Sequence, residues 1–249
     1  EKIPYGVTVG ITAWNFPVAL AGRKIGPALI AGNAMVVKPP LETPLSTLLL
    51  GEYALQAGIP AGVFSIVTGS GSELGDALVR NKRTKLVTMT GSSSAGKQIA
   101  RTAAENFTAV RLELGGKAAN VIFADAAIDQ AVEGIVNGIF FNQGHVCCAG
   151  SRLFVQESVA EQVVRKLRDR METLIVGDPL DKNTDIGAIN SKQQLDKIED
   201  YTVIDIRAYN DYINGHIPGA YHSSLATLLD DLATTIPSHR PYVVACYTR

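Results

Sequence analysis

The residues with the clearest chemical potential lie between Phe140 and Arg152, where the sequence reads FFNQGHVCCAGSR. Cys147 stands just past a run of helical character, in a segment flanked by glycines that let the backbone approach a ligand closely. A thiol in such a loop can form a thiolate and attack a carbonyl carbon. The competing interpretation is a buried structural cysteine, which burial statistics favour for a cysteine considered alone.

Two other segments place polar groups where strands are expected to end. Glu113 closes a β-rich run and precedes two glycines in ELGGK. Sites in α/β sheets lie at strand ends, although a single glutamate there is more often a surface charge. The segment Thr90–Gly96, TGSSSAG, follows a strand and opens a helix, so its backbone N–H groups could face a phosphate. A Gly/Ser turn without a ligand is an equal alternative for this segment considered alone.

The elements that must position these residues alternate between β-rich and helical segments. This alternation predicts a mostly parallel sheet covered by helices. The expected strands are Val7–Trp14, Ala34–Lys38, Val63–Thr68, Lys85–Thr90, Val110–Leu114 and Ala119–Phe123. The expected helices are Pro44–Ala57, Leu74–Val79, Ala95–Glu105, Asp129–Phe141 and Val159–Leu174.

Composition narrows the classes of function. The 249 residues carry a formal net charge of -1, so no basic surface points to nucleic acid or to an anionic membrane. Apolar runs are too short to span a bilayer. Three cysteines, of which Cys147 and Cys148 are adjacent, do not form a disulfide framework, so a reducing, cytoplasmic location is expected. No motif with metal-ligand spacing occurs, and we expect no metal site.

Taken together, the segments closely resemble the aldehyde dehydrogenase superfamily over about residues 4–196. The resemblance implies an α/β fold with a Rossmann-like parallel sheet and helices on both faces. It divides the chain into an NAD(P)-binding domain over 1–116, incomplete at its N-terminus, and the first part of a catalytic domain over 117–200. The matching blocks, in chain order, are Thr12–Pro17, Gly26–Leu29, Gly32–Asn33, Val37–Pro39, Glu42–Pro44, Thr90–Ser92, Glu113–Lys117 and Asn142–Cys147.

The resemblance also implies a role for each matching residue. Cys147 corresponds to the nucleophile and Glu113 to the general base, whereas Cys148 corresponds to a variable neighbour. Asn15 corresponds to the side chain that binds the oxyanion together with the N–H of Cys147. The implied cofactor residues are Lys38 at the adenosine ribose, Gly91, Ser92 and Gly96 at the turn and helix start near the phosphates, and Ile11 and Trp14 lining the cleft.

The activity implied is NAD(P)-dependent oxidation of a small aldehyde to a carboxylic acid through a cysteine thiohemiacetal and a thioester. Leu41 stands where many NAD-preferring members have a glutamate on the ribose hydroxyls. An apolar residue neither makes that contact nor repels a 2′-phosphate, so NAD and NADP both stay open, with NAD favoured. His145 stands where glutamine is common, and we interpret it as a loop histidine. The intact parent is expected to form a homo-oligomer.

The last fifty residues resemble a different family, the rhodanese-like domains. Three blocks carry this resemblance: Val203–Arg207, Asn214–Ala220 and Pro241–Cys246. In an intact domain Cys246 would carry sulfane sulfur, but the usual Gly and Arg of that loop do not follow it, and we expect this site to be inactive. Near Asp200 a polar helical segment runs into an expected strand without Gly or Pro, an unusual boundary between domains.

Three hypotheses therefore compete. The leading one is an aldehyde dehydrogenase lineage centred on Cys147. The second is a sulfurtransferase or sulfur-carrier module over 201–249, centred on Cys246. The third is an inactive fragment or chimera in which two truncated domains are joined.

Overall fold

The structure is a computed structural model, and it describes residues 2–192, 194, 202–205, 221–222 and 242–245. The chain divides into two compact units, residues 1–115 and residues 116–249. The expectations for the join near Asp200 and for the site at Cys246 concern residues outside this described part.

The first unit is built around a sheet of five parallel strands. The strands are β1 (Val7–Ile11), β2 (Ala34–Lys38), β3 (Phe64–Ile66), β4 (Thr84–Gly91) and β5 (Ala109–Leu114). Their order in the sheet is β3-β2-β1-β4-β5, so the chain builds outward from β1 in one direction and then crosses back to build in the other. In doubly wound sheets, ligands bind beyond the carboxyl ends of the strands at such a reversal.

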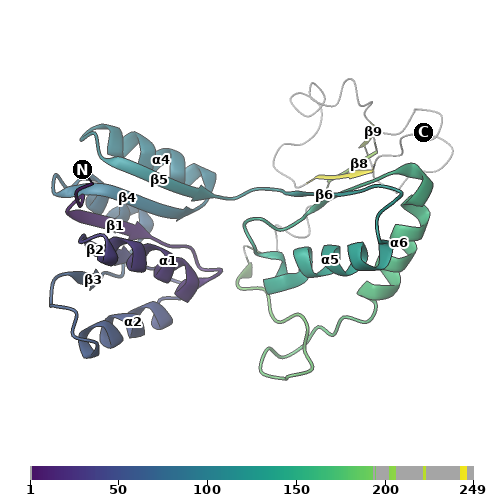
Figure 1. Ribbon diagram of the computed structural model, residues 1–249, viewed down its shortest axis with the longest axis horizontal. Coiled ribbons are helices and arrows are strands. Elements are labelled where there is room, and N and C mark those ends of the chain that lie inside the picture. The colour runs from purple at the N-terminus through teal and green to yellow at the C-terminus, as the bar shows by residue number, and fades with distance from the viewer. Residues whose placement is uncertain (1, 193, 195–201, 206–220, 223–241, 246–249) are drawn as a thin grey trace. The chain divides into compact units, whose positions relative to one another are not determined.

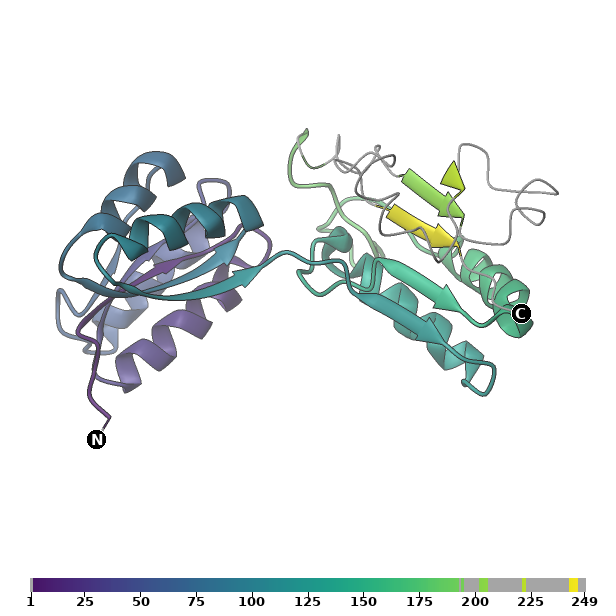
Figure 2. The same ribbon diagram turned by 90° about the horizontal axis from the view of Figure 1, so that it is seen from above.

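Helices cover both faces of this sheet. They are α1 (Pro17–Ile30), α2 (Leu45–Gln56), α3 (Asp76–Arg80) and α4 (Ser93–Ala104). α1 and α2 pack together against β2 and β3, whereas α3 and α4 pack together on the other face (Figures 1 and 2). The expected α/β class, a Rossmann-like parallel sheet with helices on both faces, is therefore confirmed.

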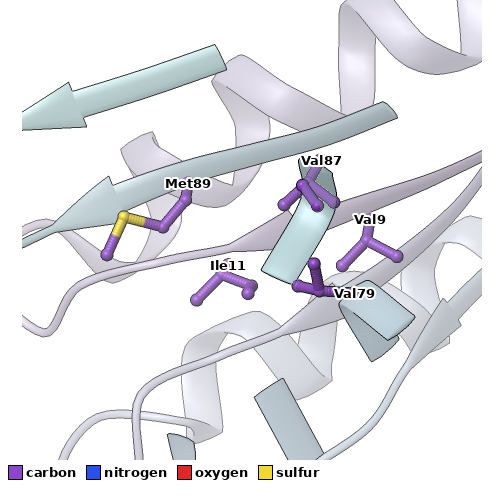
Figure 3. Close-up of a cluster of buried hydrophobic side chains, with 6 residues drawn as sticks. Val9, Ile11, Val79, Val87 and Met89 are labelled. Atoms are coloured by element: carbon purple, nitrogen blue, oxygen red, sulfur yellow. The ribbon is translucent and has the colours of Figure 1, made fainter. Parts of the chain in front are cut away.

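Apolar side chains fill the layer between the sheet and the pair α3 and α4. Successive side chains of a strand point to opposite faces, so Val9 and Ile11 of β1 share this side. Val87 and Met89 of β4 point the same way, and Val79 of α3 packs among them (Figure 3). The residues between these strand positions point to the opposite face, which α1 covers.

Sequence reasoning missed helix α1. Its segment contains Gly22, Gly26 and Pro27, which all have low helix propensity. Pro17 begins the helix, where a missing N–H removes no intrahelical hydrogen bond. Burial of Leu20 against the sheet shows how tertiary packing overrides weak propensity in this helix.

The other predicted elements of the first unit lie close to their expected positions, with two differences. The strand expected over Val7–Trp14 ends at Ile11. The expected helix Leu74–Val79 is divided between a π-helical turn, Gly71–Gly75, and α3. Within the described residues, none of the helices combines the length and the apolar character that crossing a membrane requires.

The second unit combines short parallel sheets with two long helices. Its first elements are β6 (Ala119–Ile122), α5 (Ile128–Phe140), β7 (Arg152–Val155) and α6 (Glu157–Met171). β6 pairs with β7, and Ile122, Ile135 and Val163 form the buried centre beneath them. The remaining described strands are β8 (Thr202–Asp205), β9 (Tyr221–His222) and β10 (Tyr242–Ala245), which form a parallel sheet in the order β10-β8-β9.

Candidate active site

The carboxyl ends of the parallel strands bring several expected site residues of the first unit to one edge of the sheet. The register pairs Ile11 with Lys38 at the ends of β1 and β2. It also pairs Thr90 with Glu113 near the ends of β4 and β5, and β4 itself ends at Gly91. We call this the carboxyl edge, and it is where α/β sheets bind nucleotides.

A buried lysine from α1 reaches this edge. The Lys24 Nζ atom donates hydrogen bonds to Oγ1 of Thr90 at 2.9 Å and to Oγ1 of Thr88 at 3.3 Å. The alternation of side chains along β5 places Glu113 on the same face as its register partner Thr90. Gly10 in β1 leaves room for the lysine stem, because a Cβ atom there would lie 3.3 Å from Cδ of Lys24.

This environment changes the acidity of Lys24, of which only 7% is exposed. Burial lowers the pKa of Lys24 from 10.5 to about 8, and the carboxylate of Glu113 opposes that shift. Sequence reasoning missed Lys24 because a lysine is normally read as a surface residue. The signal that could have found it is its spacing from Leu20, since residues four apart share one face of a helix.

The first turn of α4 supplies the candidate phosphate site. Ser92 is the N-cap, and its Oγ atom accepts a hydrogen bond from the N–H of Ala95 at 3.2 Å. Ser93 and Ser94 follow it and are exposed. The first N–H groups of a helix have no acceptor within the helix, and the helix dipole attracts anions to that end. This turn therefore has the donors that a pyrophosphate requires.

The glycines of this turn are needed for packing. The N–H of Gly96 donates to the carbonyl of Ser92 at 2.9 Å, so it already has an acceptor inside the helix. A Cβ atom on Gly96 would lie 2.7 Å from Cδ2 of Leu114, and one on Gly91 would lie 2.5 Å from Cε of Met89. Glycine at position 96 therefore lets α4 start close against Leu114 of the sheet, whereas Gly91 faces the flexible end of Met89 in its own strand.

Lys38, the expected ribose contact, is buried at the end of β2. Its Nζ atom donates to the carbonyl of Pro39 at 3.1 Å. Burial lowers the pKa of Lys38, and the nearby carboxylate of Glu42 opposes that shift. Leu41 is exposed beside them. The carboxylate whose charge acts on Lys38 is therefore that of Glu42, whereas position 41 carries a leucine.

Trp14 and Asn15 lie in the segment that follows β1, and both are partly buried. The hydroxyl of Thr43 donates to the carbonyl of Trp14 at 3.2 Å, and the N–H of Thr12 donates to the carbonyl of Lys38 at 3.2 Å. These bonds tie the segment after β1 to the segment after β2. Asn15 is thereby held near the carboxyl edge.

The expected nucleophile belongs to the second unit, on a turn between α5 and β7. The N–H of Ala149 donates to the carbonyl of Val146 at 3.0 Å, so Cys147 and Cys148 are the two central residues of a β-turn. Both cysteines are free and exposed. Burial lowers the pKa of His145, and a hydrogen bond to the backbone of Asn142 opposes that shift. We call Val146–Ala149 the thiol turn.

The chain reaches the thiol turn through a left-handed segment. Asn142, Gln143 and Gly144 have φ values of 51°, 54° and 76°. The first two are not glycines, and such conformations are strained for residues with side chains. With its amide oxygen directed toward Gly187, the Gln143 side chain accepts a hydrogen bond from that N–H at 3.2 Å. This bond ties the segment before the thiol turn to a separate loop.

The chain leaves the thiol turn through a second anchor. The Asn120 side chain in β6 donates from Nδ2 to the carbonyl of Gly150 at 2.8 Å. A Cβ atom on Gly150 would lie 2.4 Å from that nitrogen, so a larger residue here would displace the Asn120 side chain. The carbonyl oxygen of Cys147 lies 3.6 Å from where a Cβ atom of Gly116 would stand. Sequence reasoning missed Asn120, which lies three residues after the ELGGK block.

The structure therefore groups the expected residues in two sets. Cys147 lies in the second unit with the anchors of its turn. All the other expected residues lie in the first unit, along the carboxyl edge and the segments that follow its strands. They are Ile11, Trp14, Asn15, Lys38, Gly91, Ser92, Gly96 and Glu113.

Comparison with known proteins supports the same lineage. The profile of the aldehyde dehydrogenase family matches residues 1–218. The chain is 49% identical over 199 residues to 3,6-anhydro-alpha-L-galactose dehydrogenase from Vibrio sp. strain EJY3, covering 80% of this chain and 42% of that protein. The chain thus spans less than half the length of this curated relative.

Solved structures agree in fold. An NADP-dependent enzyme of E. coli superposes with a TM-score of 0.81 at 34% identity, covering 99% of this chain and 53% of that chain. A betaine aldehyde dehydrogenase variant from Staphylococcus aureus in complex with NAD+ gives a TM-score of 0.77 at 41% identity, covering 79% of this chain and 39% of that chain.

The end of the chain matches a second profile, that of the rhodanese-like domain, over residues 190–249. Both resemblances expected from the sequence are therefore confirmed. Because the dehydrogenase profile covers most of the residues, including every expected site residue from Ile11 to Cys147, the chain belongs to the aldehyde dehydrogenase family.

Proposed function

We propose that this chain carries the groups for NAD(P)-dependent oxidation of an aldehyde to a carboxylic acid, with Cys147 as the nucleophile. The observation that carries the proposal is the thiol turn, which presents Cys147 exposed and anchored on both sides. The turn also lies against Gly116, three residues after Glu113.

The chain's residues would act in sequence on the aldehyde. The Sγ atom of Cys147 bonds to the carbonyl carbon and gives a tetrahedral thiohemiacetal. Its oxyanion accepts hydrogen bonds from the Asn15 side chain and the N–H of Cys147, a kind of stabilisation worth about 3–4 kcal/mol. NAD(P), when bound, supplies the acceptor for the hydride that leaves the thiohemiacetal carbon, and a thioester on Cys147 results.

Hydrolysis of the thioester needs a base. The carboxylate of Glu113 would take a proton from water, whose oxygen bonds to the acyl carbon while the carbon–sulfur bond breaks and the thiolate leaves. Lys24 is near that carboxylate and is easier to deprotonate than an ordinary lysine. Its hydrogen bonds to Thr88 and Thr90 hold the ammonium beneath the carboxyl edge.

The first unit fits a dinucleotide. The reversal of strand order, the exposed first turn of α4 and the close packing of Gly96 on Leu114 are the features such a cofactor needs. We infer that NAD is preferred, because the carboxylate of Glu42 near Lys38 would accept ribose hydroxyls and repel a 2′-phosphate. Glu42→Gln should shift the ratio of kcat/KM toward NADP, and an unchanged ratio would contradict this inference.

The test of the proposal uses Cys147→Ser with Cys148→Ser as the matched control. NAD(P)H formation from a panel of small aldehydes should vanish in the first variant and persist in the second. A second readout does not need the cofactor: an activated acetate ester should acylate Cys147, seen as one added acetyl group by mass spectrometry. If the native chain shows neither NAD(P)H formation nor acylation at Cys147, the proposal is wrong for this chain.

The match of residues 190–249 to the rhodanese-like domain supports a second candidate function, sulfur transfer at Cys246. That residue directly follows β10 in the sequence. Transfer of sulfur from thiosulfate to cyanide should then survive Cys147→Ser and vanish with Cys246→Ser.

A further inference from the structure

The proposed reaction uses one thiol of the turn and leaves the other without a role. Cys147 and Cys148 occupy the two central positions of the thiol turn, and both are free and exposed. Neither residue belongs to a helix or a strand. An exposed thiol directly beside an exposed thiol is the arrangement from which a reversible bond between the two can form.

The geometry determines what kind of bond this would be. Neighbouring Cα atoms joined by a trans peptide lie about 3.8 Å apart, whereas disulfides ordinarily span about 4.4–6.8 Å between Cα atoms. A bond between Cys147 and Cys148 is therefore strained and easily reduced. Exposed, strained disulfides belong to the labile and regulatory class, whereas structural disulfides resist reduction.

The distortion would fall mainly on the turn itself. The peptide link between the two cysteines lies inside the turn, so twisting it disturbs mainly the hydrogen bond from Ala149 N–H to the Val146 carbonyl. The anchors from Asn120 and Gln143 attach outside the turn, at Gly150 and before His145. They would keep the flanking chain in place and return the thiols to their original positions after reduction.

We propose that Cys147 and Cys148 form a disulfide with each other when the protein meets a peroxide, and that this bond protects Cys147 from irreversible oxidation. The inference goes beyond the proposed dehydrogenase function. It gives Cys148 a role and makes the thiol turn a reversible modification site.

The chemistry balances with the peroxide as the oxidant. One sulfur attacks a peroxide oxygen, the O–O bond breaks, and a sulfenic acid and one water form. The second sulfur then attacks the sulfenic sulfur, the S–O bond breaks, and a second water leaves with the thiol proton. Two thiols are oxidised to one disulfide and one hydrogen peroxide is reduced, and the product is the same whichever sulfur reacts first.

The test is intact-mass and peptide mass spectrometry of the full chain in a Cys246→Ser background, treated with hydrogen peroxide. The chain with both cysteines of the turn should lose the mass of two hydrogens within the peptide that contains Cys147, and dithiothreitol should restore it. Cys148→Ser should instead gain the mass of two or three oxygens at Cys147, which dithiothreitol does not reverse.

Three results would overturn the proposal. The first is irreversible oxidation of Cys147 at the same rate with and without Cys148. The second is a disulfide that links two copies of the chain and disappears on dilution. The third is no loss of hydrogens at all. Because the readout is mass, failure of dehydrogenase activity leaves this test intact, and the acylation assay on the reduced chain reports separately on the proposed function.

Discussion

The buried ammonium of Lys24 gives the first unit a stability that depends on pH in a direction the structure fixes. Burial lowers the pKa of Lys24 to about 8 in the folded chain, against 10.5 for an ordinary lysine. Below about pH 8 the Lys24 ammonium holds its proton in both the folded and the unfolded state, and the folded state carries the full cost of burying the charge. Between the two values the unfolded state binds more protons, so the free energy of unfolding rises with pH.

The magnitude follows from the size of the shift. One pKa unit corresponds to about 1.4 kcal/mol, so the shift of Lys24 from 10.5 to about 8 corresponds to at most about 3.5 kcal/mol. Screening by water at the carboxyl edge reduces the measurable part to about 2 kcal/mol. Lys24→Met removes the ammonium and keeps an apolar stem of similar length. The difference in unfolding free energy between native chain and variant should therefore change by about 2 kcal/mol from pH 7 to pH 10.

The assay is urea unfolding followed by tryptophan fluorescence, because Trp14 is the chain's single tryptophan and lies in the first unit. The native chain should gain stability relative to Lys24→Met as the pH rises. Lys97→Met, which removes an exposed lysine of α4, is the control and should track the native chain at every pH. If the native and Lys24→Met curves run parallel from pH 7 to pH 10, the ammonium is not desolvated and the reasoning is refuted.

Three further predictions concern particular side chains. Asn33→Ala should lower the unfolding free energy by about 1–3 kcal/mol in urea titrations, because the buried side chain of Asn33 accepts the N–H of Gly6 at 3.0 Å and the variant leaves that donor without its partner; an unchanged midpoint would contradict this. Gly150→Ala should lower the free energy of unfolding by about 1–3 kcal/mol through its clash with Asn120. It should also change the rate at which the thiols of Cys147 and Cys148 react with Ellman's reagent, and an unchanged rate would show that Asn120 does not position the thiol turn. The NMR titration midpoint of His145 should lie below the ordinary 6.5, and a midpoint at or above that value would refute its burial.

The sequence predicts much of the first unit because its strands are short, β-branched and bounded by turn residues. β2 spans Ala34–Lys38 as expected, and β5 begins one residue before the predicted Val110. Helix α1 could not be predicted from propensity, since Gly22, Gly26 and Pro27 oppose it and only packing against the sheet stabilises it. In the first unit the elements that follow from local preference were found, and α1, which depends on tertiary contacts, was missed.

Sequence motifs also predict the candidate site unevenly. The residues that would touch the aldehyde or the cofactor are chemically distinctive, and matching blocks identify them. The residues that position those side chains are not chemically distinctive in the sequence. Asn120 and Lys24 look like surface positions in the sequence, and only the hydrogen bonds to Gly150 and to Thr90 reveal what they do. A positioning role depends on a partner distant in the chain, which a single sequence does not specify.

The glycines show why a motif and a mechanism need separate arguments. Gly96 was expected at the cofactor phosphates, but its N–H already donates to Ser92 and its missing side chain makes room for Leu114. A substitution there would displace the start of α4, the turn at which we propose that the cofactor phosphates bind. Gly150 is similar, since it makes room for Asn120 beside the thiol turn. In both cases glycine is needed for packing, because α4 must approach Leu114 closely and the chain after the thiol turn must approach Asn120 closely.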